Sequence, residues 1–204
     1  MLVLDHFVVA GTSRAIATDW VSNTLGEMPK VSGKHKYFGT HNHLWGMGPT
    51  CYLETISINH AAAKPEFARW FGLDHFVGPP RLAGWVLATK NIKHTLSQLD
   101  PEFGEPVRLQ RGKYQWVISV SASGQLPFGG YGPALIEWEG GFHPCLDLPD
   151  SKCRLHTLKI RHPQAETMKS SLGDLMNDDR IIFETGVEKI SAEIEKDERL
   201  ITLQ

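Results

Sequence analysis

The stretch that decides the fold is LDHFVVAGTSRAIATDWVSNTLGEMP at residues 4–29. A second stretch, LAGWVLATKNIKHTLSQLDPEFGEP at 82–106, can be laid on it at an offset of 78 residues that is constant through Glu27. Each contains an apolar strand, a polar helix-capping residue and an amphipathic helix with a glycine near its end. Ser13 and Asn91 coincide as the capping residues. Because few residues are identical, the recurrence of these signals in order carries the comparison, and it predicts a repeated strand–helix unit.

Further strands are predicted after each helix, where β-branched and aromatic residues are concentrated. These strands are expected at 36–45, 51–58, 115–120 and 134–138. The segment ALIEW at 134–138 can be laid on YLETI at 52–56, shifted by one residue so that Glu137 falls on Glu54. The repeated unit is therefore predicted to be a module in which a strand and a helix are followed by further strands.

The chain divides into four regions on this basis. Residues 1–60 form the first module, a proline-bearing connecting loop covers 61–80, and residues 81–150 form the second module. Residues 151–204 start with the strand-like LHTLKI and a helical pattern, which predicts a partial third module. We expect all of these regions to pack as one unit.

Composition narrows the class of protein. The 204 residues are 41% hydrophobic and 22% charged, with a formal net charge of −2, so no basic surface for nucleic acid or anionic membranes is indicated. No segment approaches the ~18 apolar residues of a membrane span, and the N-terminus lacks the basic start of a signal peptide. Three cysteines form a sparse, odd set typical of a reducing compartment. We expect a cytoplasmic protein whose partner is a small molecule.

Several short motifs follow one another along nearly the whole chain. They are LDHFVVAGTS at 4–13, GTHNHL at 39–44, YLE at 52–54, WFGLD at 70–74, RLAGWVL at 81–87, LPFGG at 126–130, ALIEW at 134–138 and RLHTLKIRHP at 154–163. In this order they resemble the glyoxalase-like domain family of the vicinal-oxygen-chelate superfamily. The resemblance implies an α+β fold in which repeated βαβββ modules form curved mixed β-sheets around a cavity, here with a C-terminal βαβ-type extension. It does not fix the reaction, because the superfamily includes lyases, isomerases, dioxygenases and binding proteins.

The resemblance also implies a divalent metal held by residues on the first and last strands of each module. Those positions here are His6, Glu54, Glu137 and, as the repeat partner of His6, Gly84. Glycine has no side-chain donor, so the chain departs from the usual four-ligand pattern. One imidazole and two carboxylates suit Fe, Mn, Ni or Zn, and three ligands leave an open position for a substrate. The alternative is an inward polar pocket with no metal.

Two further residues are candidates for catalysis. His41 and His43 alternate along a predicted strand, which places both on one face and leaves Asn42 on the other. His43 is a candidate general base because histidine titrates near neutrality, and Glu137 is the other candidate catalytic residue. The ordinary alternative for the histidines is the polar edge of a sheet.

Four tryptophans on predicted strands are candidates for lining a substrate pocket: Trp45, Trp85, Trp116 and Trp138. If they face inward, they favour an aromatic or extended apolar ligand. The alternative is ordinary packing between sheets and helices.

Two functions therefore stay open. The first is a metal-dependent lyase, isomerase or dioxygenase that acts on a small oxygenated molecule. The second is a metal-free protein that binds or sequesters a small molecule on the same scaffold. The sequence also leaves open whether the modules pair within one chain or across a homodimer.

Overall fold

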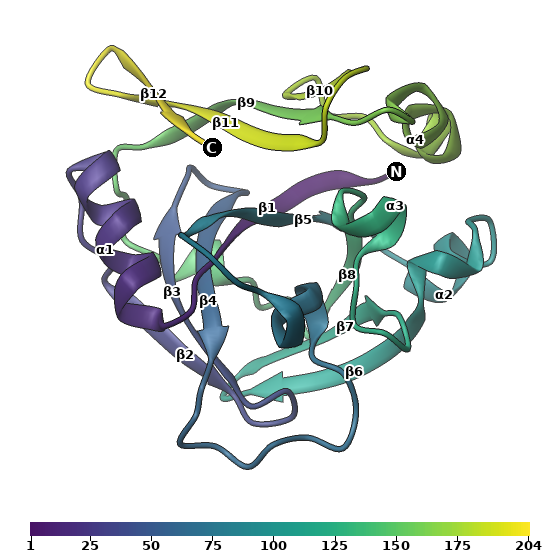
Figure 1. Ribbon diagram of the computed structural model, residues 1–204, viewed down its shortest axis with the longest axis horizontal. Coiled ribbons are helices and arrows are strands. Elements are labelled where there is room, and N and C mark those ends of the chain that lie inside the picture. Colours follow the sequence, from purple (N-terminus) through teal and green to yellow (C-terminus); the bar gives the residue numbers. More distant parts are fainter.

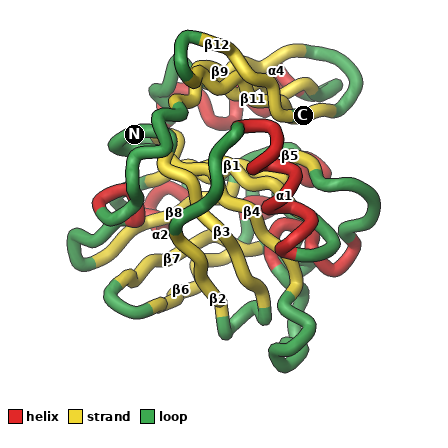
Figure 2. The backbone as a smooth tube through the Cα atoms, turned by 90° about the vertical axis from the view of Figure 1, so that its left-hand side faces the viewer, coloured by secondary structure: helices red, strands yellow, loops and turns green.

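The computed structural model describes residues 1–204 as two stacked β-sheets with short helices around them (Figure 1). An eight-stranded sheet has the strand order β2-β3-β4-β1-β5-β8-β7-β6, and a four-stranded sheet has the order β10-β9-β11-β12. The large sheet curls into an almost closed barrel, and the small sheet lies across its back beside β1 and β5. Figure 2 shows the same two layers from the side.

The first module runs from the N-terminus to residue 58. Its elements are β1 (Val3–Ala10), α1 (Arg14–Leu25), β2 (Val31–His35), β3 (Thr40–Gly46) and β4 (Tyr52–Ile58). Ser13 caps α1, since its side chain accepts from the backbone N–H of Ile16. Gly26 ends α1 in the left-handed conformation, with φ of 62°. The single strand predicted at 36–45 is in fact part of the β2–β3 hairpin.

The second module repeats this order of elements. It contains β5 (Arg81–Ala88), α2 (Ile92–Leu96), β6 (Glu105–Arg111), β7 (Tyr114–Val120) and β8 (Ala134–Glu139). Asn91 caps α2 by accepting from the backbone N–H of His94, as its alignment with Ser13 predicts. Short helical turns lie in the connections: η1 (Trp70–His75), η2 (Pro101–Phe103), α3 (Pro127–Gly130) and η3 (Pro144–Leu146).

A local two-fold symmetry relates the two modules within this one chain. They join edge to edge through the antiparallel β1–β5 pair, while β1 is parallel to β4 and β5 is parallel to β8. Phe7 pairs with Trp85, which is also its partner at the sequence offset of 78. The axis of the repeat therefore passes through this residue pair, and the predicted fold class is confirmed.

Both central strands carry a β-bulge, and the two bulges are related by the same offset. The register shifts at Asp5 in β1 and at Ala83 in β5. A bulge adds one residue to its strand and re-aims the side chains around it. As a result, the consecutive residues Asp5 and His6 both reach the concave face, whereas Leu4 and Phe7 pack in the core on the convex face.

The C-terminal region forms the small sheet. It contains β9 (Arg154–Arg161), α4 (Ala165–Leu172), η4 (Gly173–Leu175), β10 (Ile181–Glu184), β11 (Lys189–Lys196) and β12 (Arg199–Leu203). The β9–α4–β10 segment is a parallel βαβ unit, as predicted for the extension, and the β11–β12 hairpin joins the other side of β9. In the modules the first strand pairs with the fourth instead. The region is therefore not connected as a third copy of the module.

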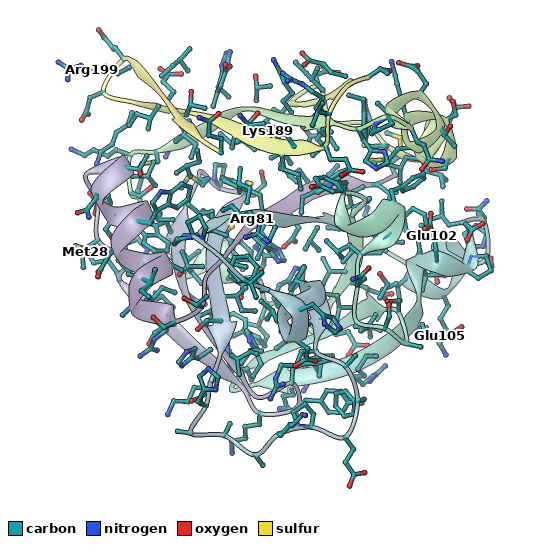
Figure 3. All side chains as sticks on the ribbon, in the orientation of Figure 1. Met28, Arg81, Glu102, Glu105, Lys189 and Arg199 are labelled. Carbon is teal, nitrogen blue, oxygen red and sulfur yellow. The ribbon has the colours of Figure 1, made fainter.

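Two hydrophobic cores hold these layers together. The larger core lies on the convex side of the large sheet, between that sheet, α1 and the small sheet. Ile190, Ala192 and Ile194 of β11 contribute to it, and Lys189 and Arg199 mark the start of β11 and of β12 in Figure 3. The smaller core fills part of the concave side. None of the helices has the length and apolar character needed to cross a bilayer.

Candidate functional site

A small polar cavity lies on the concave side of the large sheet, in the half formed by the first module. Its polar lining comes from β1, β2, β3, β4 and β6, and its other wall is aromatic. The free space is about 20 Å³, enough for a single water molecule. The polar and aromatic lining residues are His6, His35, Asn42, Tyr52, Glu54, Arg111, Trp70, Phe71, Trp116 and Trp138.

A buried carboxylate, that of Asp5, organises one end of the cavity. It accepts hydrogen bonds from His6 Nδ1 at 2.6 Å, Trp138 Nε1 at 2.8 Å and His143 Nε2 at 3.0 Å. An ionised carboxylate can only accept, so Nδ1 of His6 carries its hydrogen. Nε2 of His6 then faces Glu54 Oε2, 3.5 Å away. The three side chains form a line from Asp5 through His6 to Glu54.

The two carboxyl groups of this line are shifted in opposite directions. Burial by itself raises the pKa of Asp5, but hydrogen bonds from His143 and His6 outweigh it and hold that pKa well below the usual range. Burial raises the pKa of Glu54, and the charge of His6 and the amide of Asn42 only limit this rise. Asp5 therefore stays ionised, while burial disfavours the ionised form of Glu54.

The opposite end of the cavity carries a positive charge. Asn42 Nδ2 donates to Glu54 Oε1 at 2.6 Å, and Arg111 Nη1 donates to His35 Nε2 at 3.1 Å. Burial, and then the charge of Arg111, lower the pKa of His35, so this imidazole is a neutral acceptor. Arg111 has no carboxylate within ion-pair distance. Its guanidinium group is therefore available to an anionic ligand.

Aromatic rings complete the walls. Tyr52 stacks on His6 with ring centroids 4.4 Å apart, and Trp116 and Trp138 lie 5.5 Å apart. Trp70 is buried, and its indole N–H has no acceptor. Flat, polarizable walls and one unused donor suit an organic ligand that carries oxygen atoms.

The structure brings four of the predicted site residues to the cavity and places Glu137 on the opposite face of the sheet. His6 and Glu54 meet in the cavity, and Trp116 and Trp138 line it. Glu137 lies on the convex face, where its Oε2 accepts from the backbone N–H of Ile92 at 2.8 Å. It therefore stabilises the start of α2 instead of joining His6 and Glu54.

The strand register explains the position of Glu137. Glu54 on β4 lies beside Val8 on β1. The repeat partner of Val8 is Val86, and the residue beside Val86 on β8 is Ala134. Ala134, not Glu137, is thus the counterpart of Glu54. The offset between the modules has grown from 78 at the first strand to 80 at the last.

Three other predicted site residues lie outside the cavity. His43 shares a hydrogen bond with a threonine of α1 at 2.8 Å. Trp45 donates to the backbone carbonyl of Glu27, and Trp85 donates to that of Tyr131. Both indoles belong to the convex core, so the packing alternative describes these two tryptophans.

The residues present do not fit the four-ligand metal centre that the resemblance implies. The two first-module positions carry donors, but their second-module counterparts are Gly84 and Ala134. A Cβ at Gly84 would lie 2.9 Å from atoms of Phe71 and Leu126, so apolar side chains occupy that place. Nowhere in the chain do three or more His, Cys, Asp or Glu residues form a group arranged to hold a metal. A catalytic metal usually takes three protein ligands.

Several residues of the cavity were not predicted. Asp5 did carry a signal, because it is a charged residue inside an apolar run that predicts a buried strand. Asn42 lies on the face opposite to His43, as strand alternation predicts, but that face is the concave one. Arg111 and His35 carry no local signal, since they meet only where the two edges of the curled sheet approach.

Two βαβββ modules joined edge to edge around a concave site define a known class of protein. A family model described as "Glyoxalase-like domain" matches residues 4–176. The chain belongs to this glyoxalase-like family, within the vicinal-oxygen-chelate superfamily that its motifs predicted.

The chain is similar to solved structures of other proteins. A hypothetical protein from Staphylococcus aureus is similar with a TM-score of 0.63 and 17% identity, covering 93% of this chain and 88% of that one. Methylmalonyl-CoA epimerase from Mycobacterium tuberculosis has a TM-score of 0.42 and 14% identity, covering 66% of this chain and 85% of that one. Among curated proteins, none matches the sequence.

Proposed function

We propose that the concave cavity binds a small oxygenated anion and that Glu54 and His6 transfer a proton on it. The observation that carries this proposal is the buried line of Asp5, His6 and Glu54, in which a carboxyl group with a raised pKa faces an oriented imidazole. Such a pairing is typical of general acid–base catalysis. The reaction class is isomerisation or epimerisation at a carbon beside a carbonyl group.

Each side chain has a distinct role in this transfer. Arg111 pairs with a carboxylate of the ligand. The Glu54 carboxylate takes a proton from the carbon beside the carbonyl group, which leaves protonated Glu54 and an enolate. The imidazole of His6, which Asp5 orients through Nδ1, stabilises the enolate oxygen by a hydrogen bond from Nε2. Glu54 then returns the proton to the opposite face of the enolate in an epimerisation, or to another carbon in an isomerisation, so that no proton is gained or lost overall.

The transfer uses only side chains of this chain. The second module offers Gly84 and Ala134 where the superfamily pattern has ligands, so the proposal relies on the organic groups of the first module. We therefore expect the reaction to continue after treatment with a strong chelator.

Exchange of carbon-bound hydrogen for deuterium tests the proposal. Pyruvate and benzylpyruvate are incubated with the protein in deuterium oxide, and proton NMR follows the hydrogens beside the ketone. The wild type should accelerate exchange, and Glu54→Gln should lower the rate by a factor on the order of 10²–10⁴. Glu137→Gln is the matched control and should keep the wild-type rate. Equal rates for Glu54→Gln and the wild type would refute proton transfer by Glu54.

A second candidate is binding without reaction, favoured by the aromatic walls of the cavity and by Arg111, which has no carboxylate partner. In that case the acids quench the fluorescence of the tryptophans around the cavity, but exchange stays at the uncatalysed rate. Binding with no exchange would support a sequestering protein.

A further inference from the structure

The concave face is polar in one half and apolar in the other. The repeat symmetry pairs four polar residues of the first half with small or apolar residues of the second. The pairs are Asp5 with Ala83, His6 with Gly84, Asn42 with Ile118, and Glu54 with Ala134.

Phe71 and Leu126 fill the space that these small residues leave. Atoms of both side chains lie 2.9 Å from the position that a Cβ on Gly84 would take. Phe71 is also the residue shared by three cavities. It lines the polar cavity, a second small cavity beside Ala134, and an outer cleft.

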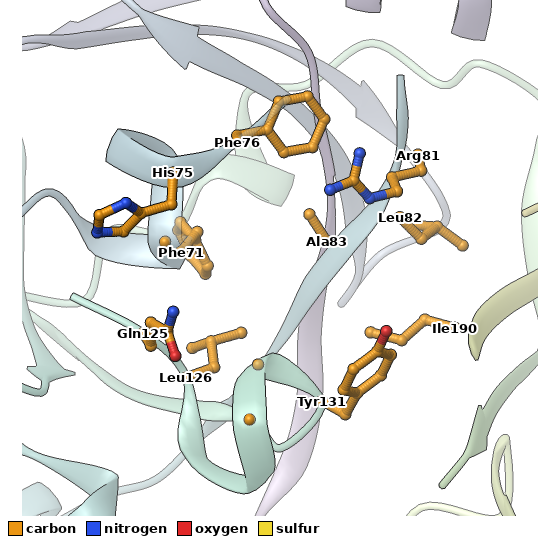
Figure 4. Close-up of a pocket in the computed structure, with 13 residues that line it drawn as sticks. Phe71, His75, Phe76, Arg81, Leu82, Ala83, Gln125, Leu126, Tyr131 and Ile190 are labelled. Atoms are coloured by element: carbon orange, nitrogen blue, oxygen red, sulfur yellow. The ribbon is translucent and has the colours of Figure 1, made fainter. Parts of the chain in front are cut away.

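The outer cleft is wide enough for a ring. Its volume is about 220 Å³, and Figure 4 shows Phe71 and Leu126 on one side of it and Tyr131 and Ile190 on the other. An apolar cavity of roughly 150 Å³ is known to hold benzene. The cleft and the polar cavity both end at Phe71, so displacement of this one side chain would join them.

Phe71 has a strained backbone conformation. Its φ of 55° lies in the left-handed region, which non-glycine residues rarely adopt. Gly72 fixes the turn by donating its N–H to the carbonyl of Gly124 at 2.9 Å, and Arg69 pairs with Asp74 across the segment. Strained residues of this kind tend to lie at binding sites.

The neighbouring residue Trp70 supplies an independent observation that points to a ligand. It is 5% exposed and lines both inner cavities, yet its indole N–H has no acceptor. A buried donor without a partner is uncommon and is usually satisfied by water or a ligand. An oxygen at the junction of the two halves would satisfy it.

We propose that the second-module half of the concave face is an apolar subsite for an aromatic group of the ligand, with Phe71 setting how large that group can be. The inference rests on the proposed function in one respect, because the polar head of the same ligand occupies the cavity of His6, Glu54 and Arg111. The ligand class is then an oxygenated acid that carries an aromatic ring.

Binding affinities of a matched pair of acids test this subsite. Pyruvate and benzylpyruvate share the head group and differ in the ring, and titration calorimetry gives a Kd for each. Benzylpyruvate should bind the wild type at least about tenfold more tightly. Gly84→Ala, whose methyl group would press Phe71 and Leu126 into the subsite, should reduce this preference. Phe71→Ala should extend it to naphthylpyruvate, and Phe142→Ala on the exposed surface is the control.

Two binding measurements distinguish a failure of this inference from a failure of the proposed function. Equal affinities for the two acids in the wild type would overturn the subsite, whatever the exchange rates are. If neither acid binds, the binding of indole, which has an aromatic ring but no acidic head group, is measured instead. Indole binding that is weakened by Gly84→Ala would support the subsite while the proposed function fails. Equal indole binding by wild type and Gly84→Ala, or none by the wild type, would overturn the subsite.

Discussion

Removal of the Asp5 carboxylate is the perturbation with the largest expected effect. In Asp5→Ala, the buried donors on His6, Trp138 and His143 lose their common acceptor. Breaking a buried charged pair by deleting one partner lowers the free energy of unfolding by about 3–5 kcal/mol. Asp5→Asn keeps the size and one acceptor oxygen, so the expected loss is smaller, about 1.5–3 kcal/mol.

Urea unfolding followed by tryptophan fluorescence measures this loss. The midpoint should fall while the dependence on urea stays unchanged, which indicates a change in stability alone. Asp150→Ala is the matched control, because Asp150 pairs with Arg154 on the exposed surface, and its midpoint should stay near that of the wild type. A loss below about 1 kcal/mol for Asp5→Ala would refute the reasoning, since it would mean that the three donors find other partners.

The pH dependence of the same variants follows from the pKa of Asp5. That pKa is lower in the folded protein than in the unfolded chain, where it is about 4. The ionised carboxylate therefore stabilises the fold above about pH 4, and this stabilisation is lost as the pH falls through the folded pKa. The difference in stability between the wild type and Asp5→Asn should shrink on acidification.

Three other outcomes are expected. The raised pKa of Glu54 means that its ionisation in the fold is unfavourable, so Glu54→Gln should gain thermal stability relative to the wild type as the pH rises from acid to neutral. Glu137→Ala removes the hydrogen bond to the N–H of Ile92 and should lower the free energy of unfolding in urea by about 0.5–2 kcal/mol. The rate at which the protein exchanges the carbon-bound hydrogens of pyruvate should not change. Trp85→Ala should cost about 3–5 kcal/mol, because this fully buried indole packs in the convex core, and affinity for pyruvate should stay the same.

The repeat in the sequence predicted more of the fold than any single motif. The offset of 78 relates the strand, cap and helix of the two modules, and it also relates the two bulges and the axial pair Phe7 and Trp85. These features follow local signals, such as apolar runs and the capping residues Ser13 and Asn91, which are encoded in a few neighbouring residues. The C-terminal connectivity is not local, and its signals of strand and helix are compatible with more than one topology.

The site was less predictable because it depends on register. The alignment of Glu137 with Glu54 was chosen because both are acidic. The hydrogen-bonded register instead aligns Ala134 with Glu54. Glu137 and Ala134 are three residues apart, and a shift by an odd number of residues places a side chain on the opposite face of the sheet. Asp5 was missed because neighbours on a regular strand point to opposite faces, and only the bulge places it beside His6.

The most direct test of the central claim is the rate of hydrogen–deuterium exchange in benzylpyruvate, measured with chelator-treated wild-type protein and with Glu54→Gln. We predict that the chelator-treated wild type still accelerates exchange and that Glu54→Gln does not. If the chelator abolishes exchange and a divalent metal restores it, or if Glu54→Gln matches the wild type, proton transfer by the His6 and Glu54 pair alone is contradicted.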